Sequence, residues 1–164
     1  MSGIFRDCKS LISINLSSFN TQKVENMSNM FQGCSRLKKI DLSSFDTKKV
    51  KDMSNMFQEC QQLKEIILSP FKTESVLYLS NMFEDCISLQ KLDLTNFDMT
   101  KVVIMKEMFK NCQSLKIINF YDFKVNDVSI TDEMFCGCNL LKDIGSCTDS
   151  KILQEYKQRR TDNN

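Results

Sequence analysis

Six of the eight cysteines recur every 26 residues, at Cys8, Cys34, Cys60, Cys86, Cys112 and Cys138. Disulfide frameworks have irregular spacings, because each bridge is set by its own loop, whereas a fixed period marks a repeated structural unit. The spacing therefore predicts a stack of 26-residue coils. Each coil is counted from its cysteine, so that the first coil begins at Cys8.

Apolar residues follow each cysteine in the pattern C-x2-L-x2-I-x-L-x2-F-x4-V-x2-M-x2-MF. The alternation in I-x-L is typical of a strand with one buried face, and the steps of three and four in V-x2-M-x2-MF suit a helical or 3₁₀ segment. We therefore predict an α/β solenoid, with a parallel sheet on one face and short helical segments on the return.

The pattern also predicts the organisation of the chain. Residues 1–147 are expected to form the solenoid, with about five full coils plus a partial one. Residues 148–164 abandon the pattern and are expected to form a C-terminal cap or flexible tail. Ser150 is the expected N-cap of a short amphipathic helix in this segment.

The core positions of each coil resemble those of leucine-rich repeats. Leu37, Ile40 and Leu42, preceded by Cys34, match the leucine-rich-repeat signature, and the half-coil V-x2-M-x2-MF-x2-C resembles the BspA-like subclass of bacterial and protist surface proteins. The resemblance covers residues 4–147. It implies a leucine-rich-repeat fold and a role as an adhesin, surface protein or interaction scaffold.

The composition argues against several classes of function. The chain has no histidine to act as a proton shuttle, and it lacks the phosphate-loop, metalloprotease and nucleophile-elbow motifs. We therefore predict a non-enzymatic protein without catalytic residues, cofactor, metal or small-molecule substrate. A net charge of +1 argues against nucleic acid as a partner. Because nowhere do ~18 apolar residues run together, no membrane span is predicted.

The periodic cysteines are interpreted as small core residues, since a free thiol behaves as a weakly polar hydrophobe. Cys136 and Cys147 lie off the period and are interpreted as incidental thiols. Free periodic thiols, and the lack of a signal peptide in the chain as given, favour an intracellular location. The family resemblance leaves the cell surface as the alternative.

Departures from the repeat indicate where a partner binds. At 17 and 18 residues after the cysteine, the first two coils are polar, whereas the next three are mostly apolar. Stacked together, these apolar residues predict an exposed patch that contacts a protein. The patch comprises Leu77, Tyr78, Val103, Ile104 and Ile130. The alternatives are that these side chains turn inward or that a flanking segment covers them.

The outward face of the strands is a second candidate surface. Ile67, Ile117 and Tyr121 place apolar groups among the polar residues of this face, which is otherwise expected to be solvated. The leading hypothesis is a protein–protein interaction or assembly scaffold module, whose protein partners belong to a larger assembly. The alternative is a BspA-like cell-surface adhesin that binds host or matrix protein through the strand face.

Overall fold

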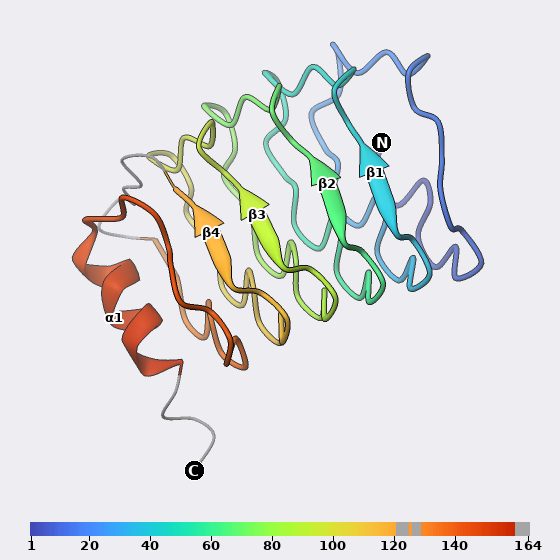
Figure 1. Cartoon of the computed structure of the whole chain (residues 1–164). Helices are drawn as coiled ribbons and strands as arrows, with labels where there is room; N and C mark the ends of the chain where they lie inside the picture. The colour runs from blue at the N-terminus through green and yellow to red at the C-terminus, as the bar shows by residue number, and fades with distance from the viewer. Residues whose placement is uncertain (121–124, 126–128, 160–164) are drawn as a thin grey trace.

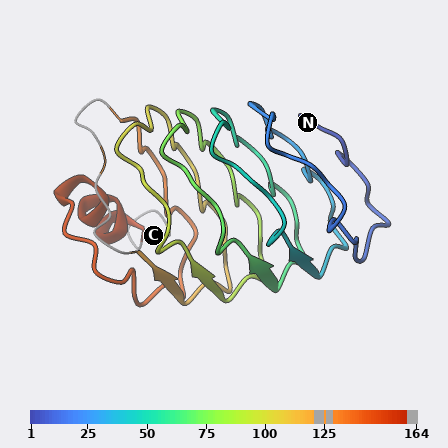
Figure 2. The same ribbon diagram turned by 90° about the horizontal axis from the view of Figure 1, so that it is seen from above.

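The computed structural model describes residues 1–120, 125 and 129–159. This part of the chain contains four short strands and one helix: β1 (Lys39–Asp41), β2 (Glu65–Ile67), β3 (Lys91–Asp93), β4 (Ile117–Asn119) and α1 (Ser150–Gln158). The strands lie side by side in chain order, and α1 lies at the far end of the row from the N-terminus (Figure 1). Seen from above, the strands occupy one long side of the coils and the return segments the other (Figure 2).

The strands bury alternate side chains, as the I-x-L pattern predicts. In β1, Ile40 is buried between the exposed Lys39 and Asp41. The strands pair in parallel with a 26-residue register, but only two by two, β1 with β2 and β3 with β4. The predicted sheet is therefore interrupted between β2 and β3 within the described chain.

The return segments are built from turns, so the prediction of short helical segments there is wrong. Asn29 and Gly33 have positive φ angles of 58° and 71°, which interrupt a right-handed helix. Between them, the Phe31 amide donates to the Met56 carbonyl of the next coil at 2.9 Å. The Gln32 amide instead donates to the Asn29 carbonyl of its own turn at 3.2 Å. Every second amide of the return therefore donates to a carbonyl of the next coil, which leaves no i→i+4 ladder of an α-helix.

A column of phenylalanine rings fills the return side of the core. Neighbouring rings of the column are stacked, with centroids 5.6 to 5.8 Å apart. The column comprises Phe31, Phe57, Phe83, Phe109 and Phe135, all of which are buried. Offset stacking of this kind adds to the free energy gained from burying the rings.

The periodic cysteines form a second buried column. The thiol of Cys60, for example, donates to the Phe31 carbonyl, 29 residues earlier in the chain, at 3.2 Å. Cys34, Cys86, Cys112 and Cys138 are buried in the same way. The core assignment is wrong for Cys8, which is exposed because no described residue packs on the outer side of the first coil.

Helix α1 packs against the last coil of the stack. Its N-cap is Asp149, whose carboxylate accepts two backbone amides of the first turn, and not the predicted Ser150, which is the first helical residue. Ile152 is fully buried, and the Tyr156 ring meets the Phe135 ring edge-on at 6.2 Å. Among the described residues, no helix has the length and apolar character to cross a membrane.

Candidate partner-binding surface

A ladder of parallel backbone bridges runs across the return side of the coils. It joins the residues 18 positions after each cysteine, which are Asn26, Asp52, Tyr78, Ile104 and Ile130. The residues one position earlier take part through their main chains. The Val103 amide donates to the Leu77 carbonyl at 2.8 Å, and the Ile130 amide donates to the Val103 carbonyl at 2.9 Å. The ladder therefore brings together all five residues of the predicted apolar patch.

The apolar patch is most exposed at its two ends. Tyr78 is 40% exposed and Ile130 is 43% exposed. The other three residues of the patch, Leu77, Val103 and Ile104, are partly buried. Tyr78 and Ile130 therefore do not turn inward, whereas the other three side chains are partly covered.

In the first two coils, the polar residues at this column stabilise their own turns, which the apolar residues of the patch do not do. The Asn26 side chain accepts the Ser28 amide at 2.8 Å, and the Asp52 side chain accepts the Ser54 amide at 2.9 Å. Such Asx turns stabilise the local backbone. Tyr78, Ile104 and Ile130, at the same column, have no carboxylate or amide oxygen next to the main chain to make this bond. Coil geometry therefore does not account for the apolar residues.

An ion pair borders the patch. Lys51 Nζ lies 2.8 Å from Glu25 Oε2, and the hydrogen bond from Lys51 lowers the pKa of the Glu25 carboxyl. The Lys51 carbonyl accepts the Leu77 amide at 2.8 Å, which joins the charged border directly to the apolar patch. Both charged side chains are largely exposed, so the pair contributes little to stability.

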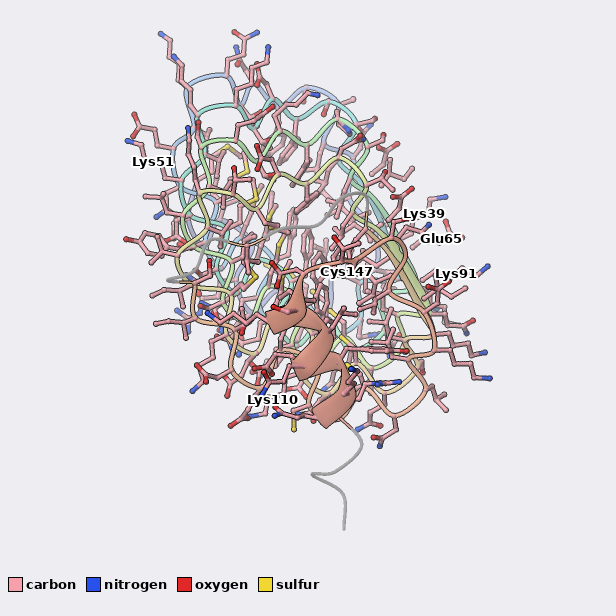
Figure 3. All side chains as sticks on the ribbon, turned by 90° about the vertical axis from the view of Figure 1, so that its left-hand side faces the viewer. Lys39, Lys51, Glu65, Lys91, Lys110 and Cys147 are labelled. Atoms are coloured by element: carbon pink, nitrogen blue, oxygen red, sulfur yellow. The ribbon has the colours of Figure 1, made fainter. Side chains whose placement is uncertain are left out.

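The residues predicted on the strand face do not join the apolar patch. Lys51 lies on the opposite side of the molecule from Lys39, Glu65 and Lys91 of the strand face (Figure 3). Ile67 in β2 is 37% exposed, and Ile117 in β4 is partly buried. Tyr121 lies outside the described residues. The two predicted surfaces are therefore separate.

Sequence reasoning missed a row of side-chain hydrogen bonds across the returns. Gln32 Nε2 donates to Gln58 Oε1 at 2.5 Å, and Gln58 Nε2 donates to Glu84 Oε2 at 2.6 Å. The three residues occupy the same position in consecutive coils, which is a signal that the sequence carries. Each bond joins one coil to the next, so the row is part of the stacking.

The row ends in a charged cluster in the later coils. Lys110 Nζ donates to Glu107 Oε1 at 3.0 Å and to Glu133 Oε2 at 2.7 Å. Asn81 also donates to Glu107, at 2.8 Å. The hydrogen bond from Asn81, together with that from Lys110, lowers the pKa of Glu107, and the two carboxylates raise the pKa of Lys110.

The buried thiols are poorly suited to nucleophilic or ligand chemistry. Burial raises the pKa of Cys34 to about 11 and raises that of Cys60 well above its ordinary value, so both thiols are protonated at neutral pH. Reactive and metal-binding cysteines are thiolates. Within the described residues, no group of three or more His, Cys, Asp or Glu side chains is placed to hold a metal ion.

Parallel strand pairs and bridges at a constant 26-residue spacing define a protein of short tandem repeats. A family model described as "Mycoplasma protein of unknown function, DUF285" matches residues 1–68 and residues 38–147. The chain belongs to this family. No curated protein and no solved structure matches the chain.

Proposed function

We propose that the chain is a BspA-like leucine-rich-repeat solenoid that acts as a non-enzymatic protein-binding or assembly module, and that it contacts its partner through the apolar patch. The fold assignment is supported by the parallel register of 26 residues and by the continuous Phe and Cys columns. Repeat proteins of this kind commonly present an extended, rigid surface to a protein.

The exchange of Asx residues for apolar ones on a continuous ladder is the observation that carries the proposal. Asn26 and Asp52 stabilise their own turns, whereas Tyr78 and Ile130 leave large apolar side chains in solvent at the same column. Exposing these side chains gains nothing for the isolated coil. Contact with a partner would bury them, and Tyr is among the residues that contribute most at protein interfaces.

The surroundings of the apolar patch suit a protein interface. An apolar centre bordered by charged residues is the usual arrangement, and the Glu25–Lys51 pair supplies such a border on one side. The backbone bonds that hold Leu77 and Val103 fix the patch before binding. A prearranged surface loses less conformational entropy when the complex forms.

The experiment replaces apolar residues of the patch with the polar residues that occupy the same column in the first two coils. The double variant Tyr78→Asp with Ile130→Asn keeps side chains that the coil already accommodates at Asp52 and Asn26. We expect circular dichroism and thermal unfolding to stay unchanged while binding weakens by about 10-fold or more. The partner is first captured from a lysate by the wild-type chain carrying a photo-crosslinker in place of Tyr78, and its affinity is then measured with purified protein.

The matched control is Ile67→Asp, a similar change of an exposed apolar residue on the opposite face. It should leave the affinity of the partner cross-linked at position 78 unchanged. Equal affinity of that partner for the wild type and the double variant, or the absence of any cross-linked protein, would contradict the proposal.

A further inference from the structure

The residues just before the strands form a column at one end of the strand face. The Lys64 amide donates to the Lys38 carbonyl, and the Lys142 amide donates to the Lys116 carbonyl, both at 2.9 Å. The Lys116 amide donates in the same way to the carbonyl of Gln90, which occupies this position in the fourth coil. Five consecutive coils therefore present equivalent residues, and all five side chains are exposed.

The column continues across the interruption between β2 and β3. The coils that carry Lys64 and Gln90 are joined beyond the strands by Asn96 Nδ2, which donates to the Ser69 carbonyl at 2.7 Å. Gln90 is uncharged, but Lys91 follows it directly and is exposed at the start of β3. Each of the five coils therefore contributes at least one lysine to this end of the strand face.

These lysines form a positively charged surface, the basic band. Its lysines are Lys38, Lys39, Lys64, Lys91, Lys116 and Lys142. Two carboxylates, those of Glu65 and Asp143, lie among them, so the band has a formal charge of +4, whereas the whole chain carries only +1. The net charge of the chain therefore does not describe this surface, which is strongly positive.

Charge is balanced in one column of the basic band and not in the other. Lys39 and Glu65 are partners in the paired strands β1 and β2, and their Nζ and Oε2 atoms lie 2.8 Å apart. One position earlier, Lys38 and Lys64 are neighbours, and the same like-charged pairing recurs in the last two coils. Apart from Lys39, no lysine of the band makes an ion pair with a carboxylate of the described residues. Coil geometry does not require these lysines, since Gln90 occupies the same column. Because like charges on neighbouring strands repel, a bound anion would stabilise the column.

The basic band is narrow, which limits the anions that fit it. Asp41 and Asp93 lie on the same face two residues beyond Lys39 and Lys91, about 7 Å along the strand. A planar membrane or a nucleic-acid duplex would place its phosphates against these aspartates as well as the lysines. Single-stranded nucleic acid binds through base stacking on aromatic side chains, and β1 to β4 contain no aromatic residue. A linear anion that crosses the strands avoids the aspartates.

The spacing of the coils distinguishes between linear anions. Neighbouring strands of a sheet lie about 4.8 Å apart, so the lysines follow one another at about that distance. Side chains on one side of an extended peptide repeat only every two residues, about 7 Å, and do not keep step with the coils. A pyranose ring is about as long as one coil is thick, so a chain of uronic acids brings one carboxylate past each coil.

We propose that the basic band binds a linear acidic polysaccharide of the uronic acid class. The sugar chain crosses the strands from Lys38 to Lys142, with about one ring over each coil. Lysine Nζ atoms donate hydrogen bonds to its carboxylates, which relieve the repulsion between neighbouring lysines. The band lies on the face opposite the apolar patch, since Lys39 and Lys91 lie on the opposite side of the molecule from Lys51 (Figure 3). The inference adds a second site and stands independently of the function proposed for the patch.

The test titrates the whole chain with fluorescently labelled oligogalacturonates of increasing length, followed by anisotropy. The affinity should rise with length up to about five rings, one for each coil of the basic band, and should then change by no more than about 2-fold. It should fall as salt is added, because the contacts are between exposed charges. The absence of binding, or an affinity that does not depend on the number of rings, would overturn the proposal.

The variants use a residue that the column already accommodates. Lys64→Gln with Lys116→Gln should weaken binding of the longest oligomer by about 10-fold or more and leave circular dichroism unchanged. Gln90→Lys completes the column and should tighten binding by at least about 2-fold. The matched control is Lys51→Gln with Lys106→Gln, which lowers the net charge equally on the return side. It should change the affinity by no more than about 2-fold. Equal losses in the two double variants would overturn the proposal.

Competitors identify the class of anion. Polyglutamate, oligothymidylate and phosphatidylserine vesicles, each at the same concentration of negative charge, should displace the labelled oligomer less well than unlabelled oligogalacturonate. Stronger displacement by any of the three would overturn the assignment to a polysaccharide. The apolar-patch double variant should bind the oligomer as the wild type does, which separates failure of this inference from failure of the proposed function.

Discussion

Thr47 exchanges two hydrogen bonds with the main chain of Lys72 in the next coil. Its Oγ1 donates to the Lys72 carbonyl at 3.0 Å and accepts the Lys72 amide at 2.8 Å. Thr21 makes the same pair of bonds with Asp46 in the next coil, at 3.0 and 2.8 Å. Thr47 is fully buried. Its hydroxyl therefore supplies main-chain partners that water cannot supply at this corner, where the two coils are not paired as strands.

Thr47→Val should destabilise the chain by about 1–3 kcal/mol, because the isosteric methyl group leaves the Lys72 amide and carbonyl without their partner. Thr47→Ser keeps the hydroxyl and should cost less, through the loss of one methyl group. Urea unfolding followed by circular dichroism measures both. Equal losses for Val and Ser would show that the hydroxyl does not contribute.

Gly145→Ala should destabilise the chain more than Gly3→Ala does. Both glycines have a φ of +62°, so both alanines meet the same backbone penalty of roughly 1 kcal/mol. A Cβ at Gly145 would lie 2.8 Å from the backbone nitrogen and oxygen of Phe120, whereas at Gly3 its nearest neighbour is a side-chain atom of Arg6 at 3.9 Å. The φ penalty is common to both variants, so any difference between their melting temperatures reports the clash with Phe120. Identical melting temperatures would contradict the predicted clash.

The repeating features were predictable from the sequence because each is specified once per coil. The 26-residue spacing predicts the parallel register, and the I-x-L pattern correctly predicts Ile40 buried in β1. The turns of the returns were not predictable from apolar spacing alone, because steps of three and four fit a helix as well as a turn. What distinguishes them is the positive φ at Asn29 and its equivalents.

The candidate surfaces were only partly predictable. Placing Tyr78 and Ile130 in one column follows from the repeat, since residues at the same offset in consecutive coils must be neighbours, and Ile104 lies between the two. The interruption of the sheet between β2 and β3 did not follow, because the apolar pattern that predicts a parallel sheet is the same in both strands. The N-cap was also missed, since Asp149 and Ser150 are both good capping residues and only the backbone decides between them.

Thiol labelling of the native chain should follow burial. Cys8 is exposed and should react with a thiol reagent at once. Cys60 and Cys86 should react only after unfolding, because burial both shields them and raises their pKa values. Mass spectrometry of the peptides after a short pulse of reagent measures this. Labelling of Cys86 at the rate of Cys8 in the native protein would contradict the buried column.

Stability should decline in alkaline solution. Burial raises the pKa of Cys34 to about 11, above the value of about 8.5 for a thiol in the unfolded chain. The folded state therefore holds a proton that the unfolded state loses. The stabilisation is complete below about pH 8.5 and is lost as the pH rises toward 11. Cys34→Ala should lessen this slope in the free energy of unfolding, and an unchanged slope would contradict the assignment.

Lys110 should contribute more to stability than its neighbour Lys106. Lys110 Nζ bridges Glu107 and Glu133 at 3.0 and 2.7 Å with its side chain 26% exposed, whereas Lys106 Nζ lies 3.8 Å from Glu107 and is 47% exposed. Lys110→Met leaves two carboxylates without their shared cation and should cost roughly 1 kcal/mol, and Lys106→Met should cost less. The difference should shrink in about 1 M salt, where charges are screened.

The dependence on pH has a definite sign for the same pair of variants. Hydrogen bonds from Asn81 and Lys110 lower the pKa of Glu107 in the folded state, so its contribution is present above the ordinary glutamate range and is lost as the pH falls below it. The stability difference between the wild type and Lys110→Met should therefore narrow in acid. Urea titrations at neutral pH and at about pH 3 would measure this. A difference that stays constant between these conditions would mean that Lys110 acts through packing of its aliphatic chain, because packing does not titrate.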